Sequence, residues 1–171
     1  MIVCAGDIES FEFAVPIGIG LIDSAINLTR IVLEDNPKSL TFIGSAGSYG
    51  KYKPFDIIES SESVNIENSF LTGGSYTPIK SHVSRETIDI VNSSNYITTD
   101  EKLSKSYREM NIELENMEFF SVMRVAQEFK IPVRGIFIVT NYCNKNAHKD
   151  FLANHEKAKN LLSQYIKELK L

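Results

Sequence analysis

A carboxylate and a carboxamide are the side chains of this sequence best placed to do chemistry. Glu118 lies at the start of a run, 119–129, whose apolar residues recur with helical spacing, and its carboxylate can accept two hydrogen bonds from a vicinal diol such as that of a ribose. Asn141 follows the apolar run 133–140, and its carboxamide offers both a donor and an acceptor to the edge of a heterocycle. The alternatives are a dipole partner at a helix start for Glu118 and a turn-forming residue for Asn141.

A third candidate is the small-residue segment 44–47, Gly-Ser-Ala-Gly, directly after the apolar run 40–43. Glycines allow close approach to the backbone, and the hydroxyl of Ser45 adds to the amide donors, so an anion or a ligand oxygen can bind there. A tight turn that only packs closely explains the same residues equally well. In both interpretations the segment is predicted to be a turn.

Alternating strands and helices must position these residues. Apolar runs predict strands at 1–5, 11–16, 40–43, 56–64, 96–99 and 133–140, and helical periodicity predicts helices at 21–35, 85–91, 117–129 and 149–167, with a polar loop at 65–78. The runs 40–43 and 133–140 have no polar face, which is typical of parallel strands covered on both sides. We therefore predict an α/β fold over residues 1–171 as one domain, with a mixed, mainly parallel central sheet flanked by helices.

The predicted strands bring the candidate residues to one edge of the sheet. Gly6, the segment 44–47 and the pair Thr140–Asn141 each follow a predicted strand. Ligands of such sheets bind beyond the carboxyl ends of the strands. A ligand site is therefore expected at this edge.

Composition excludes several classes of partner. The chain of 171 residues has 18 basic and 22 acidic residues and a net charge of −4, so no nucleic-acid partner is expected. Apolar runs are too short to span a bilayer, and the first residues lack a signal-peptide pattern. The only cysteines, Cys4 and Cys143, form no disulfide ladder, and the three histidines show no metal-ligand spacing. We expect a cytoplasmic protein without membrane partner or metal.

Four segments resemble the nucleoside phosphorylase/nucleosidase superfamily, which cleaves the N-glycosidic bonds of purine nucleosides. Residues 13–28 (FAVPIGIGLIDSAINL) resemble its strand, GIG turn and helix, and 40–47 (LTFIGSAG) its phosphate-side turn. Residues 116–119 (NMEF) resemble the EMEA ribose signature, and 131–141 (IPVRGIFIVTN) the strand that carries a catalytic Asp or Asn. The matching segments occur in the family's order across residues 13–168, which makes them jointly specific.

The resemblance implies a role for each candidate residue. It implies catalytic roles for Asn141 at the purine base and Glu118 at the ribose hydroxyls. Substrate contacts are implied for Gly44, Ser45, Asn116, Met117 and Thr140, and phosphate contacts for Gly6 and Ser45.

The resemblance also implies an activity. The string 139–141 looks most like the 6-oxopurine-specific phosphorylases. The implied function is a purine nucleoside phosphorylase that converts 6-oxopurine (deoxy)ribonucleosides to free base and ribose 1-phosphate. Inorganic phosphate would be the co-substrate, with no cofactor. A homo-oligomer is also implied, in which residues 65–82 reach a neighbour's cleft.

Departures from the family pattern leave two alternatives open. Ser10 and Phe42 stand where phosphate-binding arginines are expected, so phosphorolysis would need Lys51, Lys53 or Arg85 instead. With water as the nucleophile, the protein would be a nucleosidase for a methylthioadenosine- or futalosine-type substrate. The third possibility is a family member that binds nucleosides without turnover.

Overall fold

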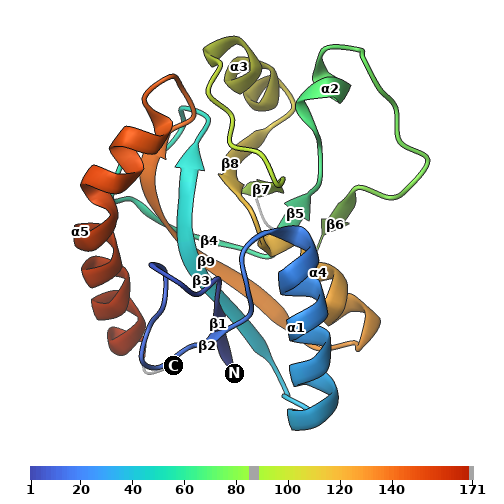
Figure 1. The fold of residues 1–171 in the computed structure, drawn as a ribbon, viewed down its shortest axis with the longest axis vertical. Helices are drawn as coiled ribbons and strands as arrows, with labels where there is room; N and C mark the ends of the chain where they lie inside the picture. Colours follow the sequence, from blue (N-terminus) through green and yellow to red (C-terminus); the bar gives the residue numbers. More distant parts are fainter. Residues whose placement is uncertain (85–88, 170–171) are drawn as a thin grey trace.

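The computed structural model describes residues 1–84 and 89–169, and these fold around a mixed sheet of nine strands (Figure 1). The strands are β1 (Ile2–Cys4), β2 (Val15–Pro16), β3 (Leu40–Ser48), β4 (Ile57–Ser60), β5 (Glu62–Val64), β6 (His82–Ser84), β7 (Ile90–Ser93), β8 (Ile112–Asn116) and β9 (Val133–Tyr142). Their order is β2-β1-β3-β8-β7-β5-β6, and β9 pairs with both β3 and β4. Five of the eight pairings are parallel, which confirms the predicted mixed, mainly parallel sheet.

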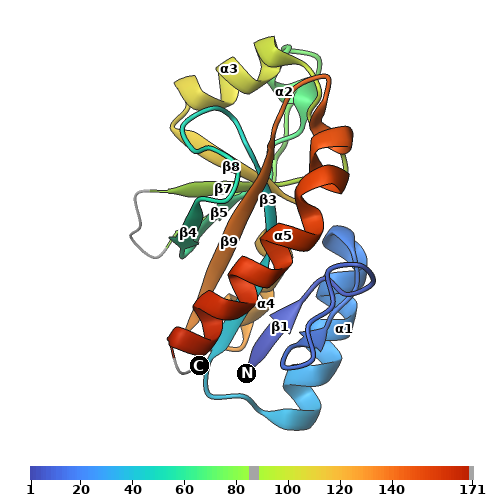
Figure 2. The ribbon, with the colours of Figure 1, turned by 90° about the vertical axis from the view of Figure 1, so that its left-hand side faces the viewer.

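Helices cover both faces of the central strands. They are α1 (Gly20–Asp35), α2 (Asn68–Leu71), α3 (Glu101–Glu109), α4 (Phe119–Glu128) and α5 (Ala147–Glu168). Figures 1 and 2 show α1 and α4 side by side on one face of β3 and β9, and α5 on the other face. Within the described residues, none of these helices combines the length and the apolar character that a membrane span requires.

The core explains why two central strands lack a polar face. Phe42 of β3 and Phe137 of β9 pack with Phe119 on the side of α4. Their strand neighbours Ile43 and Ile136 pack against α5 on the other side. Because side chains alternate between the faces of a strand, a strand covered on both sides carries apolar residues on both faces.

Several predicted elements are confirmed and others are corrected. Strands form in 1–5, 40–43 and 133–140, and helices form at 21–35, 117–129 and 149–167, each within a few residues of the predicted bounds. The predicted turn at 44–47 is wrong: these residues continue β3, because they pair in parallel with 137–141 of β9. For the same reason Asn141 lies inside β9 rather than after it.

Three other segments differ from the prediction in the length or number of their elements. The predicted strand 56–64 is two strands, since β4 pairs with β9 and β5 pairs with β7. Only Val15–Pro16 of the predicted strand 11–16 forms a strand, and the loop 65–78 contains α2.

Around β7 and β8 the prediction is also wrong. Part of the predicted helix at 85–91 lies outside the described residues, and Ile90–Ser93 form β7 by pairing with β5 and β8. Residues 96–99 form no strand, because the amide of Thr98 bonds to a side chain instead of a neighbouring strand. Both α3 and β8 lie in a stretch for which no element was predicted.

Candidate active site

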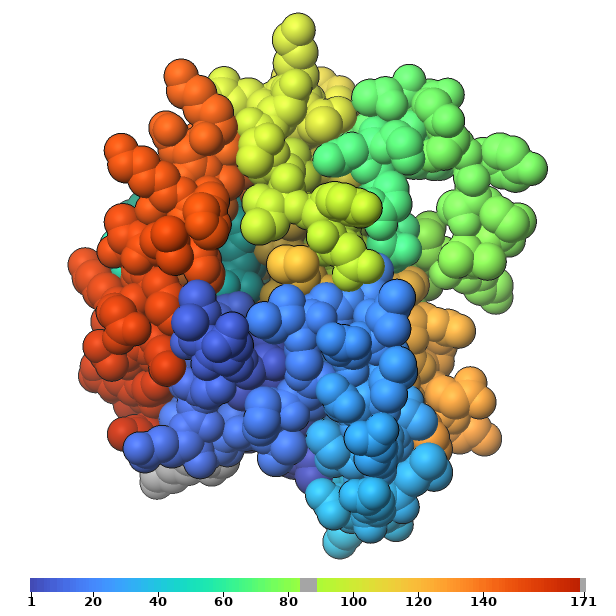
Figure 3. Space-filling view, viewed as in Figure 1, coloured from blue at the N-terminus to red at the C-terminus, as the bar shows by residue number. Residues whose placement is uncertain are grey.

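A cavity of about 260 Å³ lies where the carboxyl ends of β1, β3, β8 and β9 meet. Figure 3 shows the hollow between the N-terminal segment, the start of α5 and the segment that precedes α3. Most of the predicted site residues line it: Gly6, Ser45, Asn116, Met117, Glu118, Thr140 and Asn141. Gly44 does not: it faces the core, where an added Cβ would be 3.2 Å from the ring of Phe42.

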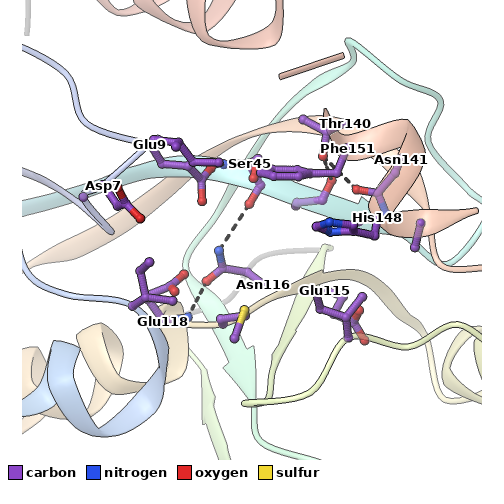
Figure 4. Close-up of a pocket in the computed structure, with 18 residues that line it drawn as sticks. Asp7, Glu9, Ser45, Glu115, Asn116, Glu118, Thr140, Asn141, His148 and Phe151 are labelled. Carbon is purple, nitrogen blue, oxygen red and sulfur yellow. Dashed lines mark hydrogen bonds between the residues drawn. The ribbon is translucent and has the colours of Figure 1, made fainter. Parts of the chain in front are cut away.

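Asn116 holds the start of α4 in place. Its Oδ1 accepts hydrogen bonds from the amides of Glu118 and Phe119, both at 2.8 Å, and its Nδ2 donates to the carbonyl of Ser45 at 3.2 Å (Figure 4). An Asn side chain in this position satisfies amides that the helix leaves unpaired. Asn116 therefore fixes the position of Glu118 relative to β3.

Glu118 directly precedes α4, and its buried carboxylate lies at the start of a second helix. Its side chain reaches α1, where Oε1 accepts the amide of Gly20 at 2.9 Å. Burial is the main cause that raises the pKa of Glu118 to about 7; the nearby charge of Glu9 adds to this effect, and the bond from Gly20 opposes it. Glu118 therefore changes between a hydrogen-bond acceptor and a donor near neutral pH.

Glu9 occupies the position that the sequence suggests for an anion. A turn closed by the bond from the amide of Glu9 to the carbonyl of Gly6, at 2.9 Å, directs its side chain toward β3. There Oε1 of Glu9 accepts the amide of Ser45 at 2.8 Å. The donor predicted for phosphate is thus bonded to a carboxylate of the chain itself.

The carboxylates of Asp7, Glu9 and Glu118 gather at one side of the cavity in Figure 4, and we call these three residues the acidic end. Sequence reasoning did not identify Asp7 and Glu9 as site residues. The available signal was two acids within three residues of Gly6 in a loop that follows a strand.

Four residues without formal acidic groups form the opposite side, which we call the amide end: Thr140, Asn141, His148 and Phe151. The hydroxyl of Thr140 donates to Oδ1 of Asn141 at 2.8 Å, and Nδ2 of Asn141 donates to the carbonyl of Tyr142 at 3.2 Å. His148 and Phe151 belong to the first turns of α5, which begins two residues before the predicted start and so brings His148 into the helix. Both were missed.

Close approach of β3 to the amide end requires a glycine. A Cβ added to Gly47 would lie 2.8 Å from Sγ of Cys143 and 3.2 Å from Nδ2 of Asn141. The pairing of the two strands also shifts here: Ala46 pairs with Val139 and Gly47 with Asn141, so that Thr140 is an extra residue in β9. This irregularity is a β-bulge at the floor of the cavity.

The lysines considered as phosphate donors lie elsewhere. Nζ of Lys51 is 2.7 Å from Oδ1 of Asp89 and 3.8 Å from Oε1 of Glu113, and Lys53 is exposed. Arg85 lies outside the described residues. Among the described residues that line the cavity, none is a lysine or an arginine.

Comparison with known proteins agrees with this architecture. No curated protein sequence matches the chain. Among solved structures, a mutant futalosine hydrolase of Helicobacter pylori superposes with a TM-score of 0.81 at 16% identity, covering 97% of this chain and 95% of that chain. A putative 5'-methylthioadenosine/S-adenosylhomocysteine nucleosidase from Francisella philomiragia gives a TM-score of 0.81 at 15% identity, with 98% and 96% covered.

A third solved structure, of a mutant 5'-methylthioadenosine/S-adenosylhomocysteine nucleosidase from Helicobacter pylori with 5'-methylthioadenosine in its active site, gives a TM-score of 0.77 at 18% identity and covers 91% and 78%. At these identities the likeness is one of fold. The sequence profile of the Phosphorylase superfamily matches residues 84–170, which is just over half of the chain. The chain therefore belongs to the phosphorylase superfamily, as its sequence segments indicated.

Proposed function

We propose that the protein is a nucleosidase, which hydrolyses the N-glycosidic bond of purine nucleosides with water as the nucleophile. The observation that carries this proposal is the 2.8 Å bond from the amide of Ser45 to the carboxylate of Glu9. A phosphorylase needs that amide, or a cation nearby, for phosphate. Here a carboxylate takes the amide, and it is well placed to activate water.

Electrostatics disfavours phosphate at the acidic end. Two like charges about 4 Å apart repel by roughly 4 kcal/mol at the effective dielectric near a protein surface. A bound phosphate would face the carboxylates of Asp7, Glu9 and Glu118 with no lysine or arginine among the described lining residues. Water carries no charge, so it binds there without this cost.

The residues suggest a role in each part of the reaction. Glu9 would accept a proton from water as its oxygen bonds to C1′ of the sugar, a task suited to a carboxylate within hydrogen-bond reach. Glu118 would accept hydrogen bonds from the ribose hydroxyls and so orient the sugar. The C1′–N bond breaks, its electrons pass to the purine, and the purine gains the proton that water lost. The products are free base and ribose.

Asn141 suggests the class of base. A carboxamide stabilises negative charge on a leaving purine through its N–H donor but supplies no proton as an acid. A 6-oxopurine leaves more readily under this arrangement than an adenine, whose departure favours protonation. We therefore propose nucleosides of 6-oxopurines as substrates. The activities named for the similar solved structures, a futalosine hydrolase and nucleosidases, are hydrolytic and support water over phosphate.

One incubation series tests the proposal. Inosine, guanosine and adenosine are each incubated with the protein, with and without phosphate, and free base, ribose and ribose 1-phosphate are measured. We expect base and ribose from inosine or guanosine at the same rate in both buffers. Release that requires phosphate and yields ribose 1-phosphate would establish the phosphorylase instead. Binding without release under every condition would indicate a nucleoside-binding protein.

A further inference from the structure

Glu115 is a second buried carboxylate beside the cavity, and the proposed reaction does not use it. It lies at the edge opposite Glu9 in Figure 4, and its residue is 6% exposed. Its Oε1 accepts the amide of Thr98 at 2.9 Å and contacts Sγ of Cys143 at 3.7 Å. Its Oε2 accepts the hydroxyl of Thr98 and, at 2.8 Å, the hydroxyl of Tyr49. One carboxylate of β8 therefore joins the residues that directly follow β3 and β9 to the segment before α3.

The segment 94–99, between β7 and α3, forms one wall of the cavity through Ile97. At its beginning, the amide of Ser94 donates to the carbonyl of Asn116 at 3.3 Å, and Oδ1 of Asn95 accepts the amide of Leu21 at 2.9 Å. Ile97 itself is 49% exposed. Thr98, with both its amide and its hydroxyl on Glu115, anchors the other end of the segment.

We propose that Glu115 is a positioning residue of the nucleosidase: by fixing Thr98 it holds Ile97 against the cavity and so determines how tightly the nucleoside binds. The proposal rests on the proposed function, because it assumes that the cavity binds a nucleoside. An apolar side chain at the wall contributes to binding in the ground state and in the transition state alike. Its displacement therefore raises KM and leaves kcat unchanged.

A carboxylate is the group that this position requires. Four donors from three segments converge on its two oxygens, and an acid accepts all of them. A glutamine would turn its own N–H groups toward some of these donors. Burial raises the pKa of Glu115, and the bonds from Thr98 and Tyr49 oppose that shift. A buried charge costs stability unless it is paired, and here its bonds hold a wall of the site.

Amide exchange tests the anchor without reference to activity. In Glu115→Gln the amide of Thr98 loses a charged acceptor, and we expect it to exchange about tenfold to hundredfold faster. Amides in the centres of β3 and β9 should exchange as in the wild type. An unchanged rate at Thr98 would overturn the proposal.

A pair of conservative variants tests the effect on binding. Thr98→Val keeps the size and the backbone amide but removes the hydroxyl, and we expect KM for inosine to rise about tenfold with kcat within roughly twofold. Thr98→Ser restores the hydroxyl and should restore KM. Tyr49→Phe is the matched control, since it removes another donor to the same oxygen without touching the segment 94–99. Its KM should equal that of the wild type.

The outcomes separate this inference from the proposed function. If Tyr49→Phe raises KM as much as Thr98→Val, or if Thr98→Val lowers kcat alone, Glu115 stabilises the core and does not position the wall. If the wild type cleaves no nucleoside, the proposed function is wrong, and the exchange rate of Thr98 still decides whether Glu115 anchors the segment.

Discussion

The acidic end and the amide end of the cavity differ in their functional groups and in the elements that carry them. The acidic end consists of carboxylates on a loop and a helix start, and backbone amides of Ser45 and Gly20 hold two of them. The amide end consists of a bulged strand and the first turns of a long helix. There the polar groups of Thr140 and Asn141 bond to each other and to the backbone.

This difference matches the two halves of the proposed reaction. A nucleophile is activated by a group that takes a proton, so the acidic end must change its charge during the reaction. A leaving group is stabilised by dipoles that are already in place, so the amide end must stay fixed. Changes at the two ends should therefore have different kinetic signatures.

The largest effect is expected from Glu9→Gln. The glutamine side chain still accepts a hydrogen bond from the amide of Ser45, but it takes no proton from water. We therefore expect kcat to fall by about 10²–10⁴-fold. Base release from inosine measures it, with circular dichroism as the check on folding. Glu12→Gln, a change at an exposed acid on the same loop, serves as the control. Turnover within a few-fold of the wild type in Glu9→Gln would rule out Glu9 as the base.

At the amide end, Asn141→Ala should lower kcat more than it raises KM, by about 10²–10³-fold, because the lost donor acts on charge that appears as the bond breaks. Asn141→Asp should shift the preference from inosine toward adenosine, since a protonated carboxyl can supply a proton. The measurement is kcat/KM for both nucleosides. Asn146→Ala, at the exposed first residue before α5, is the control. Near-normal turnover in Asn141→Ala would show that Asn141 serves only the strand.

A smaller effect should follow pH at Glu118. Its pKa of about 7 means that it loses its acceptor role as pH falls, so KM should rise about tenfold between pH 8 and pH 6. Glu118→Gln should weaken binding and remove this pH dependence. Kinetics across that range measure both.

The same group predicts how stability changes with pH. The folded pKa of about 7 lies above the ordinary value of 4.5, so the folded state favours the protonated carboxyl. The contribution of Glu118 to the free energy of unfolding is therefore complete below pH 4.5 and is lost as pH rises through 7. Urea unfolding of wild type and Glu118→Gln should therefore diverge over that window. If the free energies of unfolding of the two proteins change with pH in parallel, the titrating group is not Glu118.

The smallest effect concerns a second copy of the chain. We propose a homodimer or larger assembly in which Phe70 and Tyr76 contribute to the interface. They are 44% and 87% exposed and line a separate hollow in the loop 65–81. Light scattering at micromolar concentration should give a dimer or more, and Tyr76→Ser should weaken it. Leu33→Ser, at an exposed residue of α1, is the control. A clean monomer in the wild type would contradict the proposed assembly.

Sequence patterns predicted the strands beneath the site better than the side chains that line it. The runs 40–43 and 133–140 were readable because packing on both faces leaves a continuous apolar signal. Glu118 and Asn141 were found because one adjoins a helical apolar pattern and the other an apolar strand, and Asn116 was found through the resemblance of residues 116–119 to the ribose signature. Glu9 was not found, since its partner Ser45 is 36 residues away and only a turn at Gly6 joins them. The strand character of 44–47 was hidden for a similar reason: its glycines suit a turn, and β9 decides otherwise.

The extra residue in β9 has a consequence for how this protein can vary. A bulge places two residues of one strand opposite a single residue of its partner. Ala46 pairs with Val139 and Gly47 with Asn141, so a chain without Thr140 would keep both pairings and lose only the extra residue. The hydroxyl of Thr140, which donates to Oδ1 of Asn141, would be lost with it. The bulge is therefore a position at which the floor of the cavity can lose or gain a residue while β3 and β9 stay in register.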